Sequence, residues 1–459
     1  TALGFFSPFS RPLRGTRQFT RQAQVFLTRL WGSGYYIFPK GGINMGKLNR
    51  RDVIKGLGMA AASLAAAQRG LQARAAPSRI VWSPYVVFLN ANAKAFIVDT
   101  RTDQVVASLD TARGATLGSM TPDAKKVYVS GAGEGETRVV ILDLENLRVA
   151  KVLETGNRPK HGLVSPDGRR VGVDHWALSG GKLRLTFIRT EDDTIEKVLD
   201  IPVTNQPKGV TSMHNAWSWD SRYFFSVDRV DDRLVVVDTA DWSVRTFSAP
   251  SVPHYPVVSP DGKELWLVHE GNDRVRPGIA VYDLTRPDLP IVAQVEMPLI
   301  GEDAVEAHHG NFTQDGRYFM ALNRGPGNNL RGREVAFFSP RTKRLVHRLT
   351  CASTGVGHAY NSPDGRRVIA TNYGNNVITV IDLLGLRTLK DLVIGKGRMG
   401  HVVFTPDGRF AYLSNADGNL YKLDMRSLTV VKVIETGQTN GGGQVLNVWT
   451  NVFEELPRG

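Results

Sequence analysis

The chain has 459 residues, a formal net charge of +13 and one cysteine, a length that suits two or three average domains or one large repeat fold. The charge is concentrated in residues 1–75, which hold twelve Lys or Arg and one acid for a net +11, so the rest of the chain carries only +2. This balance excludes a nucleic-acid partner on electrostatic grounds. The single cysteine excludes an intramolecular disulfide framework, and we predict that Cys351 is a small buried hydrophobe.

The N-terminal segment has the layout of an export signal. From Met45 it reads MGKLNRRDVIKGLGMAAASLAAAQRGLQARA, which is a basic region, an Ala-rich apolar stretch and a small-x-small cleavage site at 73–75. Its Arg50-Arg51 pair resembles the twin-arginine signal of proteins that are exported folded. We predict an unstructured upstream extension at 1–44, a twin-arginine-type signal peptide at 45–75 and a periplasmic location. The apolar run is too short to span a membrane, so we expect no stable membrane anchor.

A turn sequence recurs along the rest of the chain. Its copies are TPDA (121–124), SPDG (165–168), SWDS (218–221), SPDG (259–262), TQDG (313–316), SPDG (362–365) and TPDG (405–408). Pro presets φ, Asp bonds back to the backbone and Gly supplies a positive φ, so this sequence predicts a tight turn between strands. Alternating runs such as RRVIATNY, NNVITVIDL and LKDLVIG follow the turn. They predict four strands per unit and no helix.

The period of the repeat predicts the architecture. Thr121 and Thr405 are six repeats apart, at about 47 residues each, which is the length of a four-stranded propeller blade. Seven blades carry the turn, and an eighth can combine three strands from 86–110 with one strand from 444–452. We therefore predict that residues 76–459 form an all-β, eight-bladed β-propeller of four-stranded antiparallel blades, closed by pairing of its N- and C-terminal strands. A seven-bladed ring is the alternative, and it leaves about 50 residues unplaced.

Two copies of the repeat carry a resemblance to a known family. SPDGRRVIATNYGNNVITVIDLLGLRTLKDLVIG and TPDGRFAYLSNADGNLYKLDMRSLTVVKVIETG resemble the YVTN-type propeller family, and the resemblance covers nearly all of residues 80–453. It implies a fold more than a function. With its export signal and hub histidines, the chain is also similar in architecture to the haem-binding propeller of cytochrome cd-type nitrite reductases. The sequence has no Cys-x-x-Cys-His motif, so we expect no haem c domain.

Nine of the ten histidines stand at two places in the repeat. The first place, at the start of the innermost strand, holds His161, His214, His254, His308, His309, His358 and His401. The second place, at the end of the second strand, holds His175 and His269, with Asp228 in another copy. Because these two strands are antiparallel, we expect both sets to converge on the mouth of one central funnel. His347 lies outside the pattern, and we predict that it is a surface residue.

This concentration of imidazoles predicts metal ligands, because neutral imidazole binds copper, iron, zinc and nickel. Arg229 and Arg324 follow the second place by one residue, and we predict that they hold propionates or other acids of a cofactor. Three nearby carboxylates, Glu302, Asp303 and Glu306, are predicted to ligate or to orient the imidazoles. A structural interpretation stays open, in which each repeated histidine bonds to the backbone of the next blade as a staple.

Three functions fit these features. The first is an exported propeller that binds a transition metal or metallocofactor, either copper or haem iron, with a redox or cofactor-handling role. The second is a non-catalytic propeller that binds a small molecule or a protein partner at its top-face loops, with structural histidines. The third is a propeller lactonase-type hydrolase. A resemblance to propeller lactonases implies a site built mainly of carboxylates and Asn. The histidine-rich set therefore argues against the third function.

Overall fold

A computed structural model describes residues 81–115, 117–298, 306–325, 330–438 and 442–447. In this part of the chain every regular element is a β-strand. No helix there is long and apolar enough to cross a membrane. The predicted extension at 1–44 and signal peptide at 45–75 lie outside the described residues, as do Glu302 and Asp303.

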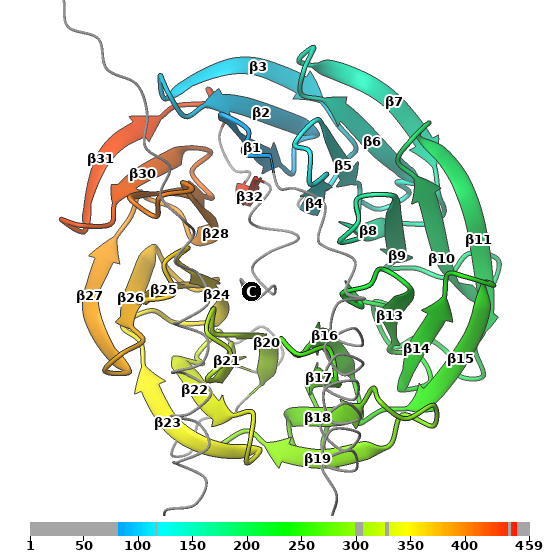
Figure 1. The fold of residues 1–459 in the computed structure, drawn as a ribbon. Coiled ribbons are helices and arrows are strands. Elements are labelled where there is room, and N and C mark those ends of the chain that lie inside the picture. The colour runs from blue at the N-terminus through cyan, green and yellow to red at the C-terminus, as the bar shows by residue number, and fades with distance from the viewer. Residues whose placement is uncertain (1–80, 116, 299–305, 326–329, 439–441, 448–459) are drawn as a thin grey trace, which may run out of the picture. The chain divides into compact units, whose positions relative to one another are not determined.

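The strands form eight four-stranded antiparallel sheets arranged as the blades of a ring (Figure 1). Blades 1 to 4 are β32 (Gly442–Leu446), β1 (Tyr85–Asn90), β2 (Lys94–Asp99) and β3 (Gln104–Asp110); β4 (Leu117–Met120), β5 (Lys126–Ser130), β6 (Arg138–Asp143) and β7 (Arg148–Glu154); β8 (Pro159–Val164), β9 (Arg170–His175), β10 (Lys182–Arg189) and β11 (Thr194–Pro202); and β12 (Asn215–Trp217), β13 (Tyr223–Asp228), β14 (Arg233–Asp238) and β15 (Ser243–Ser248). Blades 5 to 8 are β16 (Pro253–Val258), β17 (Glu264–His269), β18 (Gly278–Asp283) and β19 (Ile291–Glu296); β20 (Ala307–Phe312), β21 (Phe319–Asn323), β22 (Glu334–Ser339) and β23 (Arg344–Thr350); β24 (Val356–Asn361), β25 (Arg367–Asn372), β26 (Val377–Asp382) and β27 (Arg387–Val393); and β28 (Met399–Phe404), β29 (Phe410–Asn415), β30 (Leu420–Asp424) and β31 (Thr429–Ile434).

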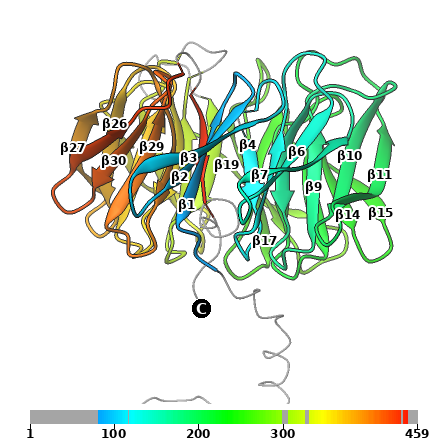
Figure 2. The same ribbon diagram turned by 90° about the horizontal axis from the view of Figure 1, so that it is seen from above.

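The predicted eight-bladed architecture is confirmed, and so is its closure. Blade 1 takes three strands from the N-terminal side and its innermost strand, β32, from the C-terminal side, with Phe88 opposite Val445. Seen from the side, the strands run between the two faces of the ring, so that strand ends gather on each face (Figure 2). This closure pairs β1, which would otherwise present a free sheet edge.

The predicted turns also form as the sequence indicated. The fourth residue of all seven copies has a positive φ, between 60° at Ala124 and 74° at Gly168. In the turn after β8, the Asp167 carboxylate accepts hydrogen bonds from Ser165 Oγ at 2.6 Å and from the Arg169 amide at 3.1 Å. The Ser165 hydroxyl in turn accepts the Arg170 amide at 3.1 Å. The Ser/Thr, the Asp and the positive φ together therefore fix the register of the first two strands of each blade.

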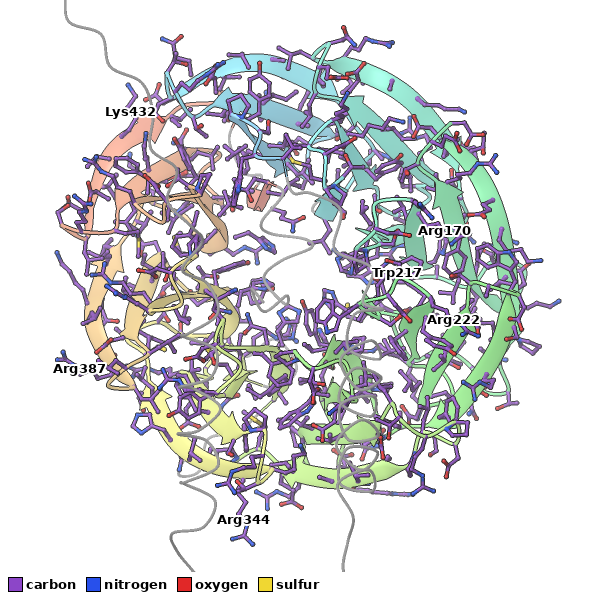
Figure 3. All side chains as sticks on the ribbon, in the orientation of Figure 1. Arg170, Trp217, Arg222, Arg344, Arg387 and Lys432 are labelled. Carbon is purple, nitrogen blue, oxygen red and sulfur yellow. The ribbon has the colours of Figure 1, made fainter. Side chains whose placement is uncertain are left out.

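Burial follows the position of each strand in its blade. The second and third strands are buried along nearly their whole length, whereas the outermost strands are exposed or half-buried along most of theirs. Figure 3 shows this difference, with Arg344, Arg387 and Lys432 at the rim and Trp217 nearer the axis. The cores between blades are apolar: Trp266 of β17 packs on Phe312 and Phe319 of the next blade. Cys351 is buried, as predicted.

Candidate metallocofactor site

Seven histidines, called here the histidine cluster, meet near the axis of the ring. They come from six blades and are His161, His214, His254, His308, His309, His358 and His401. Their rings form a continuous series of contacts, with centroids 5.2 Å apart for His161 and His214, 4.7 Å for His214 and His309, and 4.4 Å both for His309 with His358 and for His358 with His401. Two more members join in the middle, since His254 and His308 lie 4.4 Å apart. The structure thus brings together all of the histidines at the first predicted place.

A β-bulge at the start of the innermost strand aims these side chains inward. In blades 3, 5, 6, 7 and 8 the pairing of the first two strands shifts register at or beside the histidine, and His214 stands just before β12. Blade 2 has neither a register shift between its first two strands nor a histidine there. A bulge bends the strand and re-aims the extra residue. The bulge therefore makes the histidine at this place of the repeat face the axis.

In blades 3 and 8, a polar side chain on the second strand accepts the backbone amide of the cluster histidine. The Asp174 carboxylate accepts the His161 amide at 3.1 Å, and the Ser414 hydroxyl accepts the His401 amide at 2.8 Å. Both residues stand one place before the end of their strand. Since buried backbone amides are nearly always paired, these contacts hold the cluster histidines in place.

The second predicted place, at the end of the second strand, does not join the cluster. His175 lies within its own blade, where its Nδ1 donates to the Arg184 carbonyl at 2.9 Å. The Asp228 carboxylate pairs with Arg233 at 2.6 Å and accepts the Val230 amide at 2.9 Å. His269 makes no ring contact with the cluster either. It lies next to Gly278 in its own blade, where an added Cβ would stand 3.1 Å from His269 Nε2.

These three residues share a local role with the other blades. The corresponding residue is Asn in blades 1, 6, 7 and 8, where its side chain accepts amides of the following turn, as Asn372 does from Gly374 and Asn375. The residue at this place therefore faces the loop between the second and third strands. The two places therefore do not converge at one mouth as expected. Alternate residues of a strand point to opposite sides, and the residues of the second place point to the loop.

Both predicted arginines lie beside the cluster, but in ion pairs with glutamates. Arg229 Nη2 lies 2.8 Å from Glu270 Oε2, and the other oxygen of Glu270 accepts a very short hydrogen bond from His254 Nδ1. Arg324 likewise pairs with Glu306, whose Oε1 lies 3.4 Å from His308 Nδ1. Each guanidinium thus neutralises a carboxylate that touches a cluster histidine. In this structure the arginines have carboxylate partners of their own.

The Glu270 contact fixes the tautomer of His254. Arg229 Nη1 also lies 3.2 Å from His254 Nδ1, but an ionised carboxylate in such close contact can only accept, so Nδ1 carries the proton. Burial raises the pKa of the Glu270 carboxyl, but the nearby His254 and Arg229 lower it by more. The pKa of Glu270 therefore lies below its usual value. His254 Nε2 is buried and has no hydrogen-bond partner. Its lone pair is therefore available to a metal.

The two imidazoles best placed for an external ligand are His358 and His401. These two are half-buried, whereas the other five members of the cluster are at most 9% exposed. Each is held by a tyrosine: Tyr360 Oη lies 2.7 Å from His401 Nδ1, and Tyr373 Oη makes a short contact with His358 Nε2. His401 therefore keeps Nε2 free of its tyrosine, and this is the imidazole nitrogen that most often binds a haem iron.

Burial keeps the cluster histidines neutral, which is the form that binds metals. Burial, followed by the charge of neighbouring groups, lowers the pKa of His161 to about 4 and that of His401 to about 3. For His214, His308, His309 and His358, burial and the neighbouring imidazoles hold the pKa well below 6.5. The site is thus a set of neutral nitrogen donors at neutral pH.

Sequence reasoning missed several residues of this site. Lys160 and Asp174 lie beside His161; burial lowers the pKa of the Lys160 amine to about 8 and raises that of the Asp174 carboxyl to about 7. The Lys160 ammonium also lies 4.1 Å from the centre of the Trp176 ring. None of these residues recurs in the repeat. Tyr360 could have been found, because it stands two residues after His358 and alternate strand residues share a side.

The staple interpretation fits one cluster histidine. His309 Nδ1 donates to the Gly357 carbonyl of the next blade at 2.6 Å, and it is the one cluster member with such a bond in the described part of the chain. Asparagines make the same kind of link elsewhere: Asn311 donates to the Ala359 carbonyl and Asn215 to the His161 carbonyl, both at 2.8 Å. A staple therefore does not require histidine in this repeat. His347, outside the cluster, is half-buried on the outermost strand β23.

Fold and site together define a class: an eight-bladed β-propeller with a cluster of buried imidazoles near its axis. Within known proteins, the chain is 28% identical over 180 residues to protein NirF of Pseudomonas aeruginosa; the match covers 36% of this chain and 41% of NirF. The chain thus aligns with less than half of that relative. No protein-family model matches the chain, so the YVTN-type resemblance stays a prediction.

Solved structures share the fold. The dihydro-heme d1 dehydrogenase NirN in complex with DHE superposes with a TM-score of 0.64 at 21% identity, over 82% of this chain and 78% of NirN. Kuenenia stuttgartiensis hydrazine synthase gives a TM-score of 0.52 at 18% identity, over 70% of this chain and 96% of that chain. The Pseudomonas aeruginosa periplasmic gluconolactonase PpgL also gives 0.52, at 19% identity, over 68% and 97%. At these identities the likeness concerns the fold alone.

Proposed function

We propose that this chain is an exported β-propeller that binds a haem-type tetrapyrrole at the histidine cluster and handles it as a cofactor or a biosynthetic intermediate. One observation carries the proposal: seven neutral imidazoles from six blades converge near one axis, with nitrogens left unpartnered on His161, His214 and His254. Orphaned nitrogens in a buried site are costly unless a ligand uses them. The similarity to NirF and the shared fold with NirN support the choice of a tetrapyrrole over copper.

We assign the iron ligand to His401. Its ring is half-buried, and Tyr360 Oη engages its Nδ1, which orients the ring and leaves Nε2 to the iron. The Ser414 hydroxyl fixes the backbone beneath it. When bound, the iron of the tetrapyrrole would supply redox or ligand-binding chemistry, and the chain's part is to bind, orient and shield it.

The cations beside the cluster suit a ligand that carries acids. Lys160 is near enough to His401 to lower its pKa, and it offers an ammonium group on that side of the cluster. Arg324 has a buried Nε without a partner, although its Nη2 pairs with Glu306. We propose that Lys160 and Arg324 meet the carboxylates of the macrocycle. Arg229, held by Glu270 beside His254, then serves to balance charge within the site.

Export to the periplasm forms part of the same proposal. The pattern at 45–75, with Arg50-Arg51 and Ala73-Arg74-Ala75, supports it. A folded-export route suits a protein that acquires a cofactor before it crosses the membrane. The lactonase alternative has only the shared fold of PpgL in its favour.

Titration of the full chain with haemin tests the proposal. We expect a saturable change in the visible spectrum that reports nitrogen ligation at about one haemin per chain. The His401→Ala variant should weaken binding by about 100-fold or abolish the nitrogen-ligated spectrum, because it removes the iron ligand. His347→Ala, on outer strand β23, is the matched control and should bind as the parent does. A parent protein that leaves the haemin spectrum unchanged would overturn the proposal.

A further inference from the structure

We propose a second binding site within the cluster: His214, His254 and His309 form a site for a free divalent first-row transition-metal ion. One ligand nitrogen from each of these three residues lies within 4.8 Å of the other two, and all three side chains are buried. This three-histidine site does not depend on the proposed tetrapyrrole function.

The convergence of three nitrogens distinguishes this site from a haem-iron site. The iron of a macrocycle has four positions filled by pyrrole nitrogens and two axial positions on opposite sides of the plane. Three imidazole nitrogens that converge on one point therefore suit an ion that is not already held by a macrocycle. A free ion can use all three at once, and three protein ligands with an open fourth position are a common arrangement for such ions.

The hydrogen bonds of His309 and His254 present their Nε2 lone pairs to a common point. His309 Nδ1 lies 2.6 Å from the Gly357 carbonyl, which can only accept, so this nitrogen carries the proton. His254 Nδ1 carries the proton for the same reason, because it meets the Glu270 carboxylate. An imidazole whose Nδ1–H donates to a carbonyl or carboxylate is the usual partner of a bound metal ion, since this bond fixes both tautomer and orientation.

His214 supplies the third nitrogen of the site. Its Nε2 lies 3.0 Å from His309 Nε2, and since the latter holds a lone pair, His214 is the donor when no metal is bound. Metal–nitrogen bonds of 2.0–2.1 Å put two ligands of one ion about 2.9–3.4 Å apart. The separation of these two atoms already falls in this range. When a metal ion binds to His214 Nε2, the proton of this nitrogen moves to Nδ1. His214 Nδ1 can take it because it is buried without a partner.

The surroundings favour this set over its neighbour. His254, Glu270 and His308 also lie close enough to share an ion, but the Glu270 carboxylate already pairs with Arg229. Next to His309 is a cavity of about 30 Å³ lined by Tyr255, Asn311, His358 and Tyr360. That volume exceeds the ~10–15 Å³ that one water needs. It leaves room for a water molecule beside His309.

Cobalt binding without any tetrapyrrole tests the inference. The full chain, free of a histidine tag and treated with a chelator, is titrated with Co²⁺ and followed by visible absorption, which responds to coordination number. We expect one Co²⁺ per chain in a four-coordinate, nitrogen-rich spectrum, and displacement by Zn²⁺. His214→Ala and His309→Ala should each weaken binding by at least about 100-fold. Glu270→Gln should weaken it less, by about 10-fold, because it removes only the negative charge of the acceptor that orients His254.

His269→Ala is the matched control, since it removes a buried histidine outside the site. It should keep both the stoichiometry and the affinity, and thermal unfolding of each variant reports whether its fold is intact. The inference fails if the parent chain binds no Co²⁺ or Zn²⁺, or if the control loses as much affinity as the ligand variants. It also fails if His214→Ala, His309→Ala and Glu270→Gln bind Co²⁺ as tightly as the parent chain does. None of these results depends on haemin, so they separate this site from the tetrapyrrole proposal.

Discussion

At the scale of single residues, histidine has two roles in this repeat, and burial lowers the pKa in both. At the start of the innermost strand it faces the axis and joins the cluster. At the end of the second strand it serves the following loop, and burial lowers the pKa of His175 and of His269 to about 4. These two lie outside the cluster, so they report the cost of burial without any contribution from a ligand.

The pH dependence of stability follows from that shift. His175 takes up a proton at pH 6.5 when unfolded and only near pH 4 when folded. Between these values the unfolded state binds more protons, so the free energy of unfolding falls by about 1.4 kcal/mol per pH unit as the pH drops from 6.5 to 4. Above pH 6.5 this residue adds no slope.

We predict that His175→Asn flattens this dependence. Asn occupies the same place in blades 1, 6, 7 and 8, so the repeat accommodates it. The loss of unfolding free energy between pH 8 and pH 5 should shrink by about 2 kcal/mol relative to the parent. Urea unfolding at the two pH values measures the difference. An unchanged difference would show that His175 is protonated alike in both states.

At the scale of elements, the strands and the convergence of the first-place histidines were predictable, and the bulges that aim these histidines were not. The seven turn sequences predicted the first two strands of seven blades, because Pro, Asp and a positive-φ residue constrain the turn itself. The bulges that point the histidines to the axis left no sequence signal, since they depend on side chains such as Asp174 and Ser414 from the neighbouring strand. His175, Asp228 and His269 do not lie at the mouth as expected, because alternate residues of a strand point to opposite sides.

The turn residues allow a prediction at this scale. Gly408 has a φ of 64°, and a Cβ there would meet Pro363 at an ordinary contact distance of 3.5 Å. Gly408→Ala should therefore cost about 1–2 kcal/mol of unfolding free energy, from backbone conformation rather than from a clash. Gly209→Ala is the control, because a Cβ at Gly209 meets nothing within 4 Å and its φ is not positive. Equal stability of the two variants in urea unfolding would contradict the account of the turn.

At the scale of the whole molecule, ring closure turns a local repeat into a site. The period of the repeat predicted eight blades, and β32 completes blade 1 as expected. Gln444 of β32 accepts the Gly118 amide of blade 2 at 2.8 Å, and Asn447 donates to the Phe404 carbonyl of blade 8 at 3.0 Å. Closure holds the six histidine-bearing blades at fixed distances from the axis. Ring contacts between blades, such as His214 with His309, were beyond the sequence because they depend on this curvature.

The site is therefore a property of the ring as a whole. Each of the six histidine-bearing blades contributes one or two imidazoles with no local ligand motif. Glu270 follows the second strand of the blade of His254, Glu306 stands just before the strand of His308, and Tyr360 comes from the blade before that of His401. Sequence reasoning could find the donors, since they recur at one place in the repeat. Among their partners it found Glu306, which precedes His308 in the chain. It could not find Glu270 or the tyrosines, which do not recur.

The most direct test of the central claim is the visible absorption spectrum, with metal analysis, of the protein isolated from the exported fraction of its native host. We predict a tetrapyrrole band and at least about one transition-metal ion per chain, both lost together with the cluster histidines. A colourless, metal-free protein that takes up neither haemin nor Co²⁺ would contradict the claim that these imidazoles form a metallocofactor site.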